Sequence, residues 1–270
     1  MKVDSGGVAL DVEVAGEGQP VVLVHGFPDT KRLWSKQVPA LVDAGFQVIT
    51  YDTRGFGASD KPSEVDAYSI VYLAMDVTAT LDHLGIERAH VVGHDWGSAT
   101  AWATASFAPD RVDHLAALSV GHPSAFAGAG LAQREKSWYM LLFQFAPQAE
   151  QWLTMDDGQN FREWSSHPDF DAVQAEVLRD GSLTPALNYY RANVNPDALV
   201  GPPLELPPIQ SPTMGVWSSG DFALLEAQMT GSAAFCQNSF RYERVEGPGH
   251  WLQWEAPDAV NRLLIDFLPR

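Results

Sequence analysis

The sequence predicts an α/β fold in which a mostly parallel, doubly wound sheet is interrupted by an inserted helical cap. Short apolar runs, typical of strands buried on both faces, alternate with helical patterns over residues 8–121. The alternation stops after Gly121, where helical segments follow one another to about residue 207, and it then resumes. Strand–helix alternation of this kind favours parallel strands with helices on both faces of the sheet.

The first part of the chain supplies most of the expected sheet. Residues 8–15 ("VALDVEVA") alternate apolar and polar side chains, which predicts an antiparallel edge strand. The segments that predict buried strands are "PVVLVHG" (20–26), "FQVITYD" (46–52), "AHVVGHDW" (89–96) and "VDHLAALSV" (112–120). The segments with helical spacing between and after them are 31–45, 69–85 and 97–110.

The expected cap covers residues 123–207, between a first core part at 1–122 and a second at 208–270. Its helical patterns are 131–146, 149–155, 169–181 and 183–194. Six of the eighteen prolines lie from Pro196 to Pro212, which indicates a stiff connection at the end of the cap. Strand-like "TMGVWS" (213–218) and helix-like "APDAVNRLLIDFL" (256–268) then continue the core.

Composition narrows the class of protein. A formal net charge of -17 argues against a nucleic-acid partner and against binding to anionic membranes. The single cysteine, Cys236, excludes an intrachain disulfide and fits a reducing compartment. No leader-like segment opens the sequence and no apolar run is long enough to span a bilayer, so we expect a soluble, cytoplasmic protein. The sequence does not predict the oligomeric state.

The stretch "GHDWGS" (93–98) lies between a predicted strand and a predicted helix. Glycine, a central residue and a second glycine in this context predict a sharp turn that lifts the central side chain above the sheet. Here the central residue is Asp95, a candidate carboxylate nucleophile. The alternative is that Asp95 is a helix N-cap, a position that aspartate favours.

A nucleophile of this kind needs a base and a partner for the base. His250 lies in the turn-rich "GPGHWLQWEAP", and Asp221 follows the predicted strand at 213–218. The chain order Asp95, Asp221, His250 is the nucleophile, acid, histidine order of enzymes that carry such a turn. His250 would activate water while Asp221 fixes its tautomer. The alternatives are a turn histidine bonded to its own backbone and an aspartate in an ordinary turn.

The loop "HGFP" (25–28) follows the first buried strand. The backbone N–H of Phe27 and that of Trp96, at a helix N-terminus, could form an oxyanion hole. We interpret His25 as structural. Four further histidines of the first part lack the spacing of a zinc site: His90, His94, His114 and His122. We expect no metal and no organic cofactor, because side chains supply the nucleophile, acid and base.

In the order "HGFP", "YDTRGFGASDKP", "GHDWGS" and "GPGHWLQWEAP", these motifs resemble the branch of the α/β-hydrolase family that holds epoxide hydrolases and dehalogenases. The resemblance covers the core and, through the cap helices, most of the chain. It implies an α/β-hydrolase fold and a two-step reaction. The aspartate attacks a saturated carbon and forms an ester, which water then hydrolyses.

Epoxide hydrolases of this family carry two cap tyrosines in segments similar to "WYMLLFQF" and "LNYYRANV", which map to Tyr139 and Tyr190. A tyrosine is neutral at pH 7 and can protonate an epoxide oxygen. The spacing places Tyr190 on one helical face with Leu187, although Tyr189 could be the inward residue and aromatic residues at this spacing are usually core. The resemblance therefore favours hydrolysis of a small apolar epoxide to a vicinal diol.

Two other hypotheses for the function stay open. A haloalkane or haloacid dehalogenase would use the same Asp and His, with Trp96 and a cap tryptophan (Trp138, Trp152 or Trp164) as halide donors. Phe27 stands where haloalkane dehalogenases usually have an asparagine, and fluoroacetate dehalogenases place arginines just after the nucleophile, where this chain has Trp96 and Ala99. A non-catalytic ligand sensor on the same scaffold is the third hypothesis.

Overall fold

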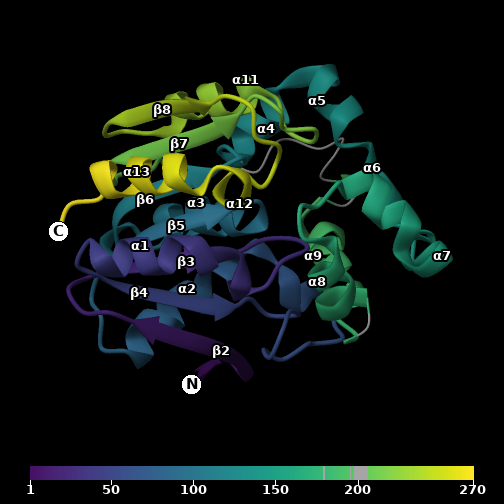
Figure 1. Cartoon of the computed structure of the whole chain (residues 1–270), viewed down its shortest axis with the longest axis horizontal. Helices are drawn as coiled ribbons and strands as arrows, with labels where there is room; N and C mark the ends of the chain where they lie inside the picture. The colour runs from purple at the N-terminus through teal and green to yellow at the C-terminus, as the bar shows by residue number, and fades with distance from the viewer. Residues whose placement is uncertain (179, 195, 198–205) are drawn as a thin grey trace.

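The computed structural model describes residues 1–178, 180–194, 196–197 and 206–270, and confirms the predicted fold class (Figure 1). One eight-stranded sheet has the order β1-β2-β4-β3-β5-β6-β7-β8. All pairs from β4 to β8 are parallel, whereas β1/β2 and β2/β4 are antiparallel. The strands are β1 Lys2–Ser5, β2 Val8–Ala15, β3 Gln19–Val24, β4 Phe46–Asp52, β5 Ala89–His94, β6 Val112–Leu118, β7 Thr213–Ser218 and β8 Phe240–Val245.

Both edges of the sheet differ from the sequence prediction. β2 is antiparallel as predicted, but it is not the edge strand, because β1 pairs with it on the outside. β1 ("KVDS") has one apolar residue and no detectable period. At the other edge, β8 ("FRYERV") is only half-buried along most of its length and carries three charged residues. Edge strands lack the continuous apolar run of a strand that is buried on both faces. They are therefore harder to predict from their own side chains.

Helices cover both faces of the sheet (Figure 1). Successive side chains of β3 point to opposite faces: Val22 and Val24 pack with helices α2 and α3, whereas Val21 and Leu23 pack with α1 and α13. The helices of the core are η1 Lys31–Lys36, α1 Gln37–Asp43, η2 Val65–Tyr68, α2 Ile70–His83, α3 Trp96–Phe107, η3 Pro109–Arg111, α11 Glu226–Thr230, η5 Gly231–Phe235, α12 Leu252–Glu255 and α13 Pro257–Phe267.

Between β6 and β7 the described residues form helices joined by loops, and most of these helices lie beyond one end of the sheet (Figure 1). The helices are α4 Pro123–Gly128, α5 Gly130–Lys136, α6 Trp138–Leu142, α7 Gln148–Ser165, α8 Phe170–Val173, the π-helical η4 Gln174–Leu178 and α9 Leu183–Asn193. α7 is broken at 155–158, where Asp156, Asp157 and Gly158 have positive φ. Residues 198–205 of the expected cap lie outside the described residues.

Aromatic side chains join these helices to the core. The Phe27 ring, from the loop after β3, lies 5.9 Å from Phe143, 5.6 Å from Phe161 and 5.6 Å from Tyr190. All four are buried in one apolar cluster. This cluster closes the carboxyl end of the sheet, where α/β enzymes place their ligands. Among the described helices, none is long and apolar enough to cross a membrane.

Candidate active site

Asp95 occupies a strained turn between β5 and α3. Its φ of 54° and ψ of −122° are unusual for a residue with a side chain. A Cβ on Gly93 would overlap the carbonyl of Gly97, and a Cβ on Gly97 would overlap that of Val24, so both glycines are required by close packing. Asp95 precedes α3, but its side chain makes no capping hydrogen bond. Asp95 thus occupies the N-cap position of α3, but side-chain capping does not explain why an aspartate stands there.

A backbone N–H from the loop after β3 holds one oxygen of the Asp95 carboxylate. The N–H of Phe27 donates to Asp95 Oδ1 at 2.8 Å. A Cβ placed on Gly26 would lie 2.5 Å from both Asp95 Oδ1 and the Trp96 nitrogen, so the loop after β3 packs directly against the turn. The loop is closed by a hydrogen bond from the Asp29 N–H to the Gly26 carbonyl at 2.9 Å. The backbone thus holds Oδ1, whereas Oδ2 is the oxygen that faces His250 and could attack a substrate.

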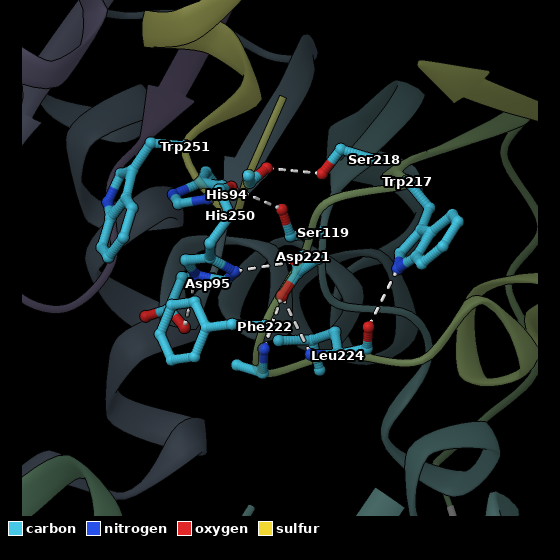
Figure 2. Close-up of polar contacts among 12 residues, drawn as sticks. His94, Asp95, Ser119, Trp217, Ser218, Asp221, Phe222, Leu224, His250 and Trp251 are labelled. Atoms are coloured by element: carbon cyan, nitrogen blue, oxygen red, sulfur yellow. Dashed lines mark hydrogen bonds and ion pairs between the residues drawn. The ribbon is translucent and has the colours of Figure 1, made fainter. Parts of the chain in front are cut away.

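Figure 2 shows His250 between two carboxylates. Its Nδ1 lies 2.9 Å from Asp221 Oδ2, and its Nε2 lies 3.6 Å from Asp95 Oδ2. The other oxygen of Asp221 accepts the N–H groups of Ala223 at 2.8 Å and Leu224 at 2.9 Å. Loops after β5, after β7 and before α12 thus converge on one point. The structure brings together the three residues that the sequence put forward as nucleophile, acid and base.

The charges around His250 set its protonation state. Burial alone would lower the pKa of His250, but the carboxylates of Asp221 and Asp95 outweigh burial and raise the pKa to about 10. Burial would likewise raise the pKa of Asp221, yet the His250 imidazolium and the backbone N–H donors hold it below its usual value. At neutral pH the site therefore contains an imidazolium flanked by carboxylates.

A small pocket is lined by Asp95 and His250. Residues from the core loops and from the cap helices line it: Phe27, Pro28, Asp95, Tyr139, Trp164, Ser165, Tyr190, Phe222, Ala223, His250 and Trp251. Its polar side chains are a carboxylate, an imidazole, two phenols and the hydroxyl of Ser165, and most of the remaining lining residues are aromatic. Such a lining suits a small, largely apolar molecule with one polar centre.

Tyr139 on α6 and Tyr190 on α9 face this pocket, and their rings lie 6.0 Å apart. Both are buried; burial, reinforced by the Asp95 charge, raises the pKa of each well above its usual value. Tyr189 points elsewhere, since its hydroxyl donates to the Arg54 carbonyl at 2.7 Å. Of the two adjacent tyrosines, Tyr190 is thus the one that lines the pocket.

The remaining polar candidates are structural in their contacts. His25 accepts the Thr53 N–H at 2.9 Å through Nε2, and burial lowers its pKa. His94 Nε2 lies 2.9 Å from the His250 carbonyl oxygen, and Figure 2 shows the two side chains next to each other. Among the described residues no group of three or more His, Cys, Asp or Glu side chains could hold a metal ion.

Three aromatic residues of the pocket lie outside the site residues that the sequence predicts. Phe222 and Trp251 line the pocket and directly follow Asp221 and His250 in the chain, so adjacency was an available signal. The sequence offers Trp164 only as one of three possible halide donors in a dehalogenase. It lines the pocket, whereas Trp138 is 48% exposed and packs its ring against Trp152 at 5.8 Å. No sequence pattern separates Trp164 from the other two; Trp152 and Trp164 lie on opposite sides of the break in α7.

The α/β-hydrolase fold family model matches residues 19–257, and the chain belongs to this family. Epoxide hydrolase A of Mycobacterium tuberculosis is 33% identical, covering 98% of this chain and 96% of that protein. The AB hydrolase superfamily protein YfhM of Bacillus subtilis is 32% identical, with the same coverage. An epoxide hydrolase of Bacillus megaterium, solved with an inhibitor, has a TM-score of 0.89 and 26% identity over 100% of both chains.

Proposed function

We propose that this chain is an epoxide hydrolase that opens a small apolar epoxide to a vicinal diol through an ester on Asp95. The observation that carries the proposal is the presence of Tyr139 and Tyr190 in the pocket that also contains Asp95 and His250. Their raised pKa values keep both phenols protonated, as donors to an epoxide oxygen must be. The similarity to proteins named epoxide hydrolases supports the same reaction.

In the first step, Asp95 Oδ2 attacks one epoxide carbon and the carbon–oxygen bond of the ring breaks. The oxygen takes a proton from a tyrosine, and the product is a hydroxyalkyl ester of Asp95. Oδ1 stays on the Phe27 N–H and becomes the ester carbonyl oxygen. Esterification removes the Asp95 charge that helps to raise the pKa of His250, so this pKa falls. The tyrosinate then regains a proton from His250.

In the second step, neutral His250 takes a proton from water while the hydroxide attacks Cγ of Asp95. The developing oxyanion lies at Oδ1, against the N–H of Phe27 and close to that of Trp96. The tetrahedral intermediate expels the diol alkoxide, which takes the proton of the new carboxyl group. Asp95 is again a carboxylate, His250 is again an imidazolium stabilised by Asp221, and water has been added to the epoxide.

In the proposed enzyme, residues 123–207 form the cap. Residues 1–122 and 208–270 form the core. This division is supported by the pocket lining, to which both the loops that follow the strands and the helices of the insert contribute residues. We also propose that the protein acts in the cytoplasm, in keeping with its single cysteine and acidic composition.

One observation favours a halide leaving group as a second candidate. The indole nitrogen of Trp164, a pocket residue, is buried without a hydrogen-bond partner. A direct comparison tests both candidates: purified protein is given apolar epoxides with diol as the readout, and haloalkanes and haloacetates with free halide as the readout. Diol without halide supports the epoxide hydrolase. Halide without diol contradicts it and assigns Trp164 to halide binding.

A further inference from the structure

The acid loop, residues 221–225, is held by a cap helix as well as by the core. Gln133 of α5 is 1% exposed, and its amide bonds to this loop at two points. Its Nε2 donates to the Ala223 carbonyl at 2.7 Å, and its Oε1 accepts the Leu225 N–H at 2.8 Å. Because a buried amide or backbone group left without a partner is costly, these bonds fix the loop relative to α5.

The same helix makes a second contact with the acid loop. The half-buried Lys136 donates from Nζ to the carbonyl oxygens of Phe222 at 3.0 Å and Asp221 at 3.3 Å. Neither Gln133 nor Lys136 is among the residues that line the pocket. Both therefore act on the loop backbone and not on a bound substrate.

These contacts lead directly to the carboxylate of Asp221. Ala223 is bonded on both sides: its N–H donates to Asp221 Oδ1, and its carbonyl accepts from Gln133. Asp221 Oδ2 in turn holds His250 Nδ1 (Figure 2). A displacement of Ala223 of a few tenths of an ångström therefore changes the direction of the carboxylate that orients the base, and hydrogen bonds weaken steeply with misalignment.

We propose that Gln133, supported by Lys136, is a positioning residue that holds the acid loop so that Asp221 can orient His250. This inference rests on the proposed function, since it assigns Gln133 to the hydrolysis of the ester. Formation of the ester depends on Asp95 and the tyrosines. Its hydrolysis depends on the Asp221–His250 pair, so the two steps respond differently to the loss of Gln133.

The variant Gln133→Met keeps the length of the side chain and removes both loop hydrogen bonds. We expect hydrolysis of the ester to slow by roughly tenfold or more, a part of the 10²–10⁴-fold that acid–base catalysis contributes. Where hydrolysis limits turnover, kcat and KM then fall in the same proportion while kcat/KM stays close to the wild-type value. The ester also accumulates, which intact-protein mass measures.

Asn193→Leu is the matched control. Asn193 on α9 is another amide that joins the cap to the core: Oδ1 accepts the Ile70 N–H at 2.7 Å, and Nδ2 donates to the Tyr68 carbonyl at 2.9 Å. It does not touch the acid loop. We expect this variant to lower the melting temperature without raising the steady-state fraction of ester. Equal accumulation in both variants would contradict a specific role for Gln133.

Hydrogen exchange of the peptide that covers residues 221–225 tests positioning without any substrate. Faster exchange of the Ala223 and Leu224 amides is expected in Gln133→Met and not in Asn193→Leu; wild-type exchange would overturn the proposal. If Gln133→Met does not fold, Lys136→Met tests the same contact from its half-buried end, with a smaller change expected in the same direction. If the wild type makes no diol, the proposed function fails, and the exchange result still decides whether α5 holds the loop.

Discussion

The core and the cap hold their site residues by different means. In the core, Asp95 and Asp221 are fixed by backbone N–H donors at 2.8–2.9 Å. In the cap, Tyr139 and Tyr190 are fixed by ring contacts, with Tyr139 4.7 Å from Trp164 and Tyr190 5.0 Å from Phe143. Hydrogen bonds weaken steeply when donor and acceptor are misaligned, whereas aromatic rings pack well in both offset-stacked and edge-to-face arrangements. In the proposed reaction, the core would therefore fix the direction from which Asp95 attacks, and the cap would select the molecule that lies in its path.

Loss of the nucleophile is expected to have the largest effect. Asp95→Asn keeps the shape of the side chain but removes the charge that attacks carbon, so turnover should fall by about 10⁴-fold or more. The measurement is kcat/KM for diol formation, together with the melting temperature as a control for folding. Turnover within tenfold of wild type in a homogeneous preparation would show that the core carboxylate is not the nucleophile.

Removal of both cap hydroxyls tests the other side of the comparison. Tyr139→Phe combined with Tyr190→Phe leaves the aromatic packing in place and deletes the proton donors. Epoxide opening should slow by about 10²–10⁴-fold with little change in stability. Because leaving halides need no proton, the same variant should keep any turnover of a haloalkane. A wild-type rate on epoxides would remove the tyrosines from the mechanism.

Replacement of the base separates the two steps. In His250→Gln, Asp95 still forms the ester but water is not activated, so one equivalent of epoxide should stay bound on the peptide that contains Asp95. Intact-protein mass followed by peptide mapping measures this. The absence of added mass, with an epoxide that the wild type hydrolyses, would contradict the role given to His250.

A smaller effect is expected on stability at alkaline pH. The folded-state pKa of His250, about 10, lies above its ordinary value of 6.5. Its contribution to stability is therefore fully present below about pH 6.5 and is lost as the pH rises towards 10. The melting temperature of the wild type should fall more between pH 7 and pH 10 than that of His250→Gln. Parallel curves would show that His250 is not charged in the folded protein.

Sequence patterns predicted the core better than its edges. β3 to β7 are buried and apolar, so their own side chains identify them, whereas β1 and β8 depend on the strands beside them. The residues Asp95, Asp221 and His250 could be put forward from turn patterns and chain order. The distances between these side chains could not be predicted from the sequence. They depend on how loops more than 100 residues apart, such as those of Asp95 and Asp221, come together.

The cap shows the limit of local patterns more clearly. Helical spacing predicted its helices, but the choice of Tyr190 over Tyr189 depends on the Arg54 carbonyl, 135 positions away in the chain. Gln133 gave no signal, since a glutamine on a helix is ordinarily exposed. The role that we propose for it rests on the position of the acid loop against α5.

A single turnover in water enriched in ¹⁸O tests the covalent route most directly. Enzyme in excess over epoxide performs one cycle, and the oxygen of the diol is traced by mass. If Asp95 attacks carbon, the new hydroxyl carries ordinary oxygen from the carboxylate, and the label appears in Asp95. If the label appears in the diol in the first turnover, water attacks the epoxide directly and the ester mechanism is wrong.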